Sequence, residues 1–119
     1  MIRLCQRAGI KTRFDVWDCN FPKKGLHPVV LISHPDRCAR AQALNVLFCT
    51  SQRQSRNPYP FEVMLDTEDG LNWETFCDCS ILWSIDAPLL ITKRGHVTLA
   101  RRRAIREKVR DMLRLSATD

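Results

Sequence analysis

The side chains in this sequence that could do chemistry are, above all, three histidines and six cysteines. The histidines are His27, His34 and His96, and an imidazole can take or give a proton close to neutral pH. The cysteines form no CxxC pair, and Cys77 and Cys79 would need two further ligands at workable spacing to hold zinc. We therefore expect reduced, mostly buried thiols in a cytoplasmic protein, with no metal site and no cofactor.

A basic loop follows the apolar run that ends at Thr50. Residues 51–60 carry Arg53 and Arg56 and lack apolar anchors, so this loop is expected to face solvent or substrate. The whole chain has 19 Lys plus Arg against 13 Asp plus Glu, a net charge of +6. Such a field attracts polyanions without carrying sequence information, so it needs a site to become a function.

Aromatic side chains could give that site its contact with nucleic-acid bases. The candidates are Trp17, Phe48, Phe61, Trp73 and Trp83. Stacking tolerates any base and is worth about 1 to 3 kcal/mol per base. Because most aromatic residues of a small domain lie in its core, only one or two should be exposed. Trp73, which lies beside the turn at Asp69 and Gly70, is the one that we expect to be exposed and to stack on a base.

The elements that position these residues are predicted to be five short strands and one helix in a single domain, residues 1–119. The strands are predicted over residues 14–21, 28–33, 44–50, 61–65 and 75–85, the last of them bent near Ser80. Residues 34–42 are predicted to form a loop or a short helical turn. Thr98 is suited to cap a helix over residues 99–115, whose arginine-rich face should be solvated. No apolar run approaches the ~20 residues of a membrane span.

Short motifs from Asp15 to Leu113 follow one another in a recognisable order. The motifs are Asp15-Val16-Trp17, Asn20-Phe21-Pro22, Gly25-Leu26-His27-Pro28-Val29-Val30, Thr50-Ser51-Gln52, Pro60-Phe61-Glu62-Val63 and Gly70-Leu71. Their order and spacing resemble the PemK/MazF-like toxins of type II toxin-antitoxin systems. The resemblance implies a small SH3-like β-barrel of about five strands with a C-terminal helix. It also implies a homodimer with RNA grooves along its interface, and a cognate acidic antitoxin that blocks them.

The same resemblance implies where RNA would be cut. In this family an Arg before the Pro of the second strand and a Thr ending the third strand carry much of a metal-independent cleavage of single-stranded RNA. These positions are His27 and Thr50 here, so His27 is expected to be general acid or base and Thr50 a phosphate ligand, supported by Ser51. Imidazole lacks the permanent forked donor of guanidinium, so Arg53 or Arg56 would have to steady the phosphate.

A further departure from the family pattern leaves two functions open. The fifth strand of the family often bears an Arg and an Asp two residues apart, where this chain has Asp78 and Ser80. Ser80 can still contact RNA, whereas Asp78 would repel a phosphate unless it is protonated or turned away. The first function is an endoribonuclease toxin. The alternative is a catalytically weakened or inactive barrel that acts by protein or RNA binding. His27 would then only cap a strand or make a turn hydrogen bond.

Overall fold

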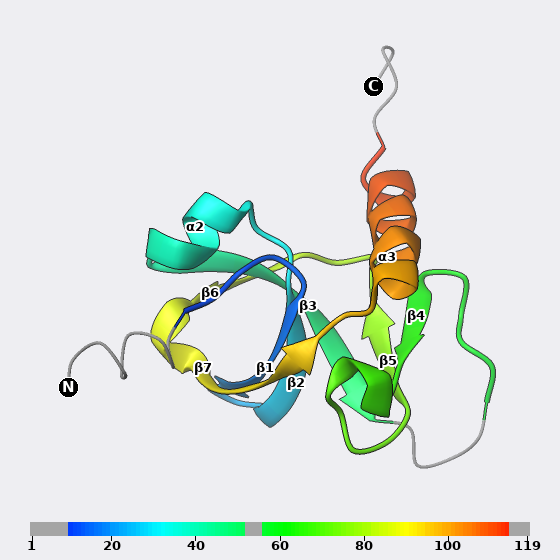
Figure 1. Ribbon diagram of the computed structural model, residues 1–119, viewed down its shortest axis with the longest axis horizontal. Helices are drawn as coiled ribbons and strands as arrows, with labels where there is room; N and C mark the ends of the chain where they lie inside the picture. Colours follow the sequence, from blue (N-terminus) through cyan, green and yellow to red (C-terminus); the bar gives the residue numbers. More distant parts are fainter. Residues whose placement is uncertain (1–9, 52–55, 115–119) are drawn as a thin grey trace.

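The computed structural model describes residues 10–51 and 56–114 and places them in a mainly β fold with a C-terminal helix (Figure 1). The elements in chain order are β1 (Asp15–Phe21), β2 (Gly25–Leu31), α2 (Pro35–Arg40), β3 (Ala43–Ser51), β4 (Glu62–Leu65), the 3-10 turn η1 (Thr67–Asp69), β5 (Thr75–Asp78), β6 (Trp83–Asp86), the 3-10 turn η2 (Ala87–Leu89), β7 (Leu90–His96) and α3 (Leu99–Met112). The predicted fold class is confirmed. No helix in the described part of the chain is long and apolar enough to cross a membrane.

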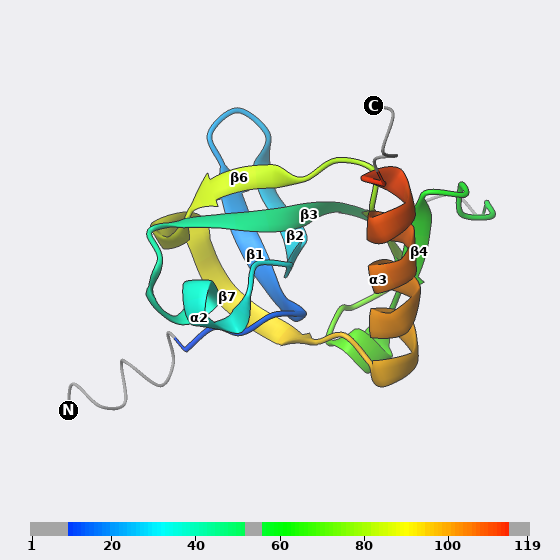
Figure 2. The same cartoon turned by 90° about the horizontal axis from the view of Figure 1, so that it is seen from above.

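One antiparallel sheet contains all the strands that the described residues form. Its order is β4-β5-β3-β2-β1-β7, and β6 pairs with β3 beside this path. The long strand β3 makes this possible, because Ala43–Val46 pair with β6 whereas Cys49–Ser51 pair with β5. Among the described residues no strand pairing joins β7 to β4, so the hydrogen-bonded path stays open (Figure 2).

Two strand predictions needed correction. The strand expected over residues 75–85 is two strands, β5 and β6, because the two ends of that segment pair with different halves of β3. The strand β7 was not predicted, since its Lys93-Arg94-Gly95 sequence lacks an apolar alternation. Pairing with β1, interrupted by two shifts of register, nevertheless holds β7 in the sheet.

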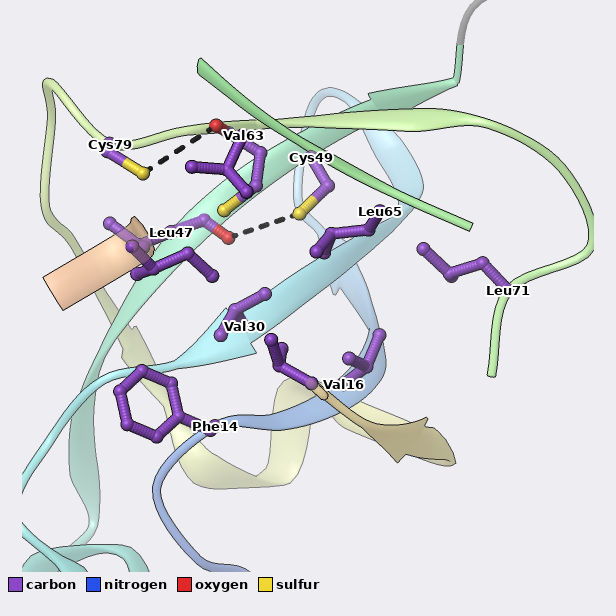
Figure 3. Packing of buried hydrophobic residues seen from close by; sticks show 12 residues of the cluster. Phe14, Val16, Val30, Leu47, Cys49, Val63, Leu65, Leu71 and Cys79 are labelled. Atoms are coloured by element: carbon purple, nitrogen blue, oxygen red, sulfur yellow. Dashed lines mark hydrogen bonds between the residues drawn. The ribbon is translucent and has the colours of Figure 1, made fainter. Parts of the chain in front are cut away.

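The sheet buries side chains on both faces. One apolar cluster joins Val16, Val30, Leu47 and Cys77 to Ile105 of α3, and Figure 3 shows its packing. The other cluster, which includes Trp17, Val29 and Val46, is covered by α2 and η2. The five described cysteines are free and buried, as predicted, and burial raises the pKa of the Cys19 thiol to about 11.

The helix α3 is anchored to the sheet by an ionic cluster at its first turn. Thr98 occupies the predicted cap position, but its side chain makes no capping bond, and its N–H instead donates to Asp69 Oδ1 at 2.9 Å. Arg101, predicted on a solvated face, donates to Asp66 Oδ1 and Asp69 Oδ2, both at 2.6 Å. That prediction was wrong for Arg101 because η1 lies against this turn of the helix. The hydrogen bond from Arg101 holds the pKa of Asp66 below its ordinary value.

Replacing Arg101 should therefore loosen α3. We expect Arg101→Met to lower the free energy of unfolding by about 1.5 to 3 kcal/mol at pH 7, because charged hydrogen bonds are lost and Asp69 stays buried. The exposed Arg103→Met, on the same helix, should cost less than about 0.5 kcal/mol.

The stability difference between wild type and Arg101→Met should also depend on pH. Because the pKa of Asp66 is depressed in the folded state, its contribution is full above the unfolded pKa of about 3.9 and is lost as pH falls through the folded value. Urea unfolding of both proteins at pH 7 and at progressively lower pH measures the difference. A difference in unfolding free energy that stays constant as the pH is lowered would contradict a role for the ionised Asp66.

Candidate functional site

The strands β2 and β3 place His27 and Thr50 on the same face of the sheet. Residues two apart in a strand lie on the same side of the sheet, so His27 shares a side with Val29, and Phe48 shares a side with Thr50. Val29 and Phe48 are partners across β2 and β3, so all four lie on one side. On the next strand, Phe76 pairs with Thr50. We call the surface formed by His27, Phe48, Thr50 and Phe76 the His27 face. The two residues expected to perform the chemistry therefore share one side of the sheet.

The His27 ring is half-buried and held in a defined position. Its Nε2 atom lies 3.0 Å from the carbonyl oxygen of Lys24, and its ring centroid lies 4.7 Å from that of Phe48. A carbonyl oxygen can only accept, so Nε2 carries the hydrogen and donates. Within the described residues Nδ1 makes no hydrogen bond. In the neutral ring Nδ1 is therefore the atom able to accept a proton.

Lys24 brings a positive charge to the His27 face. Its Nζ lies 5.6 Å from the centroid of the Phe48 ring and 5.5 Å from that of Trp83. Both rings are half-buried, and ammonium over an aromatic face is an attractive arrangement. Nothing in the sequence distinguishes Lys24 from its neighbour Lys23. The available signal was its position in the turn directly before β2, three residues before His27.

Arg56 forms a salt bridge with Glu62. Its guanidinium donates to both carboxylate oxygens of the buried Glu62, at 2.9 and 3.1 Å, and lies 4.4 Å from the centroid of Phe76. Burial by itself would raise the pKa of Glu62, but the hydrogen bonds from Arg56 and from the Tyr59 N–H outweigh burial and lower it. The expectation that Arg56 would bind a phosphate conflicts with this pairing. If Arg56 moved to a phosphate, the buried Glu62 carboxylate would lose its partner. Arg53 lies outside the described residues.

Asp78 and Ser80 bind each other at the end of β5. The Ser80 hydroxyl donates to Asp78 Oδ1 at 2.6 Å, and the Ser80 N–H donates to the same oxygen at 2.8 Å. Alternation from Phe76 puts Asp78 on the side of the sheet that carries Thr50. Ser80 thus holds the carboxylate on this side of the sheet, and the effect of Asp78 on a bound phosphate stays a prediction. Contact between Ser80 and RNA remains a prediction.

Ser51 and Trp73 lie together on the opposite side of the sheet. They line a cavity of about 170 Å³, which we call the Trp73 pocket, together with Asp18, Leu26, Thr75 and Arg94. Trp73 is 57% exposed, as expected for a residue that meets a ligand. Alternation along β3 already separates Ser51 from Thr50, and it was the overlooked signal that Ser51 would not join Thr50. Nothing in the sequence pairs Asp18 with Arg94.

The described residues offer no group of three or more His, Cys, Asp or Glu that could hold a metal ion. The His27 face carries the His27 imidazole and the Thr50 hydroxyl, and the Lys24 ammonium lies beside them. They can move a proton and stabilise negative charge on a phosphate.

Comparison with known proteins agrees with the motif order. A family model described as "PemK-like, MazF-like toxin of type II toxin-antitoxin system" matches residues 12–113. No curated protein sequence matches the chain.

Solved structures share the fold at low sequence identity. A mycobacterial endoribonuclease in complex with its cognate antitoxin is 19% identical with a TM-score of 0.74, covering 90% of this chain and 96% of that chain. The Mycobacterium tuberculosis toxin MazF-mt6 is 17% identical with a TM-score of 0.73, covering 86% and 98%. MazF in a MazE-MazF structure from Deinococcus radiodurans is 18% identical with a TM-score of 0.72, covering 90% and 98%.

Proposed function

The chain belongs to the PemK-like, MazF-like toxins of type II toxin-antitoxin systems, and from that membership we propose that it is an endoribonuclease that cuts single-stranded RNA on its His27 face. The observation that carries the proposal is the placement of His27 and Thr50 on one side of the sheet, with the Lys24 ammonium beside them. An imidazole, a hydroxyl and a cation are the groups that cleavage through a 2′-hydroxyl requires.

In this mechanism His27 acts as the general base. Its Nε2–H is held by the Lys24 carbonyl, so Nδ1 takes the proton of the RNA 2′-hydroxyl. The 2′-oxygen then bonds to phosphorus, the bond from phosphorus to the 5′-oxygen breaks, and the departing oxygen takes a proton from solvent. Thr50, exposed at the end of β3, donates to the phosphate.

Lys24 supplies the charge that the family takes from an Arg. Negative charge grows on the phosphate oxygens as the new bond forms, and a nearby ammonium stabilises it. The Phe48 and Trp83 rings keep Lys24 near His27, whereas Arg56 is neutralised by Glu62. Lys24 thus takes the role that the sequence offered to Arg56, and the same role for Arg53 stays a prediction.

The partners follow from the family. We propose a homodimer whose shared groove contains His27 and Thr50, inhibited by an acidic antitoxin and acting on RNA in the cytoplasm. The mycobacterial endoribonuclease and the Deinococcus MazF were both solved with an antitoxin. A net charge of +6 suits both an acidic polypeptide and RNA.

Product analysis tests the proposed reaction. We expect purified protein, with EDTA present, to cut single-stranded RNA and leave a 2′,3′-cyclic phosphate and a 5′-hydroxyl. These ends follow from attack by the 2′-oxygen. The same RNA in a duplex should resist, since its bases and backbone are fixed in the helix. Products that carry a 5′-phosphate, or intact RNA at stoichiometric protein, would contradict the proposal.

A further inference from the structure

The Trp73 pocket opens where β2 and β3 part. The two strands are paired from Val29 and Phe48 to Leu31 and Val46, and from Cys49 onward β3 pairs with β5 instead. The gap is bordered by Leu26 of β2 and Ser51 of β3. Ser51 follows Thr50 in sequence, so the pocket adjoins the His27 face around the edge of one strand. A nucleotide next to the scissile one could therefore enter it.

The walls of the pocket are held rigidly. Gly70 and the Arg94-Gly95 segment approach so closely that an added Cβ at Gly70 would collide with the Arg94 carbonyl group. This contact fixes the loop that carries Trp73 against β7. The Thr75 hydroxyl donates to the Trp73 carbonyl oxygen at 3.1 Å and fixes the same loop from β5. The indole is thereby presented to solvent on a constrained backbone.

The polar wall of the pocket is an ion pair between Arg94 and Asp18 that uses only one nitrogen of the guanidinium. Arg94 Nη1 donates to Asp18 Oδ1 and Oδ2, at 3.2 and 3.3 Å, and the two side chains are 22% and 14% exposed. In the described part of the chain, Nε and Nη2 of Arg94 make no hydrogen bond. The pair consequently keeps donors and acceptors for a ligand. A phosphate is a poor ligand here because the Asp18 carboxylate would repel it.

We propose that the Trp73 pocket binds a guanine base of the RNA substrate and so sets the sequence preference of the enzyme. This inference rests on the proposed function. The indole of Trp73 offers a stacking surface for a base. Guanine offers O6 and N7 as neighbouring acceptors, which suit arginine, and an N2 amino group that can donate to a carboxylate. Arg94 and Asp18 are the matching donor and acceptor.

Nucleotide titrations test the pocket without any cleavage. We expect GMP to shift the indole N–H resonance of Trp73 and to bind about ten-fold more tightly than AMP, CMP or UMP, from one bidentate base contact. IMP lacks only the N2 amino group, so it should bind more weakly than GMP. Asp18→Ala should remove this difference between GMP and IMP, since no side-chain oxygen then remains to accept from the N2 amino group. Equal affinity for all the nucleotides would overturn the assignment to guanine.

Matched variants locate the site. Trp73→Ala, followed through other pocket resonances, should weaken GMP binding by about 5- to 100-fold through lost stacking. Ile91→Ala, at a side chain that is also 57% exposed, and His27→Gln on the other face should leave GMP affinity unchanged. Unchanged GMP affinity in Trp73→Ala would contradict the assignment of the binding site to the Trp73 pocket. Because mononucleotides contain no scissile bond, guanine binding by a protein that leaves RNA intact would refute the nuclease alone, and cleavage without guanine preference would refute the pocket alone.

Discussion

His27→Gln should lower the rate of RNA cleavage by about 10²- to 10⁴-fold, the usual contribution of a general base. The amide can still donate to the Lys24 carbonyl oxygen, which His27 contacts at 3.0 Å, so the turn should keep its shape. It cannot accept and release a proton. RNA affinity should therefore change little while the chemical step slows, which single-turnover kinetics at saturating protein can separate. His34→Gln, at an exposed histidine of the α2 cap, is the matched control and should keep the wild-type rate.

The reverse substitution sharpens the test, because it replaces an imidazole, which can exchange a proton near neutral pH, with a guanidinium, which cannot. His27→Arg restores the family residue and should keep or raise the activity, because guanidinium can bind the phosphate with two donors. If wild type, His27→Gln and His27→Arg all leave RNA intact, the chain is an inactive barrel that acts by binding.

Gly70→Ala should cost about 2 to 5 kcal/mol of unfolding free energy, the largest effect that we expect of a single methyl group in this chain. Gly70 has φ of 96°, a left-handed conformation that costs an alanine roughly 1 to 2 kcal/mol. Its new Cβ would also meet the Arg94 carbonyl group and the Gly95 Cα, which are backbone atoms and cannot rotate away. The end of η1 and the strand β7 would have to move apart.

Gly25→Ala separates these two costs. Gly25 has a similar φ of 81°, but a Cβ there meets nothing within 4 Å. It should therefore cost only the roughly 1 to 2 kcal/mol of the left-handed backbone. Urea unfolding of both variants measures the difference, which reports the close approach of η1 and β7. Equal losses would show that the backbone contact at Gly70 contributes nothing.

Much of the fold follows from local patterns in the sequence. The β-branched run before Ser33, the alternation from Phe61 to Leu65 and the helical spacing after Thr98 are signals between near neighbours, and each predicted its element. The strand β7 was not predicted because its polar residues depend on pairing with β1, a partner about 75 residues away. The division of residues 75–85 escaped for the same reason, since only β3 decides where each half pairs.

The sequence by itself determined the mainly β class, the order of motifs shared with the toxin family and the free, buried state of the described cysteines, because these depend on composition and on residues close in the chain. Tertiary structure alone decided which charges are available near the candidate site. It pairs Arg56 with Glu62, places the Lys24 ammonium over the Phe48 ring, and pairs Arg94 with Asp18, 76 residues away in sequence. Such pairings are chosen by desolvation and by the curvature of the sheet, which act between residues far apart in sequence.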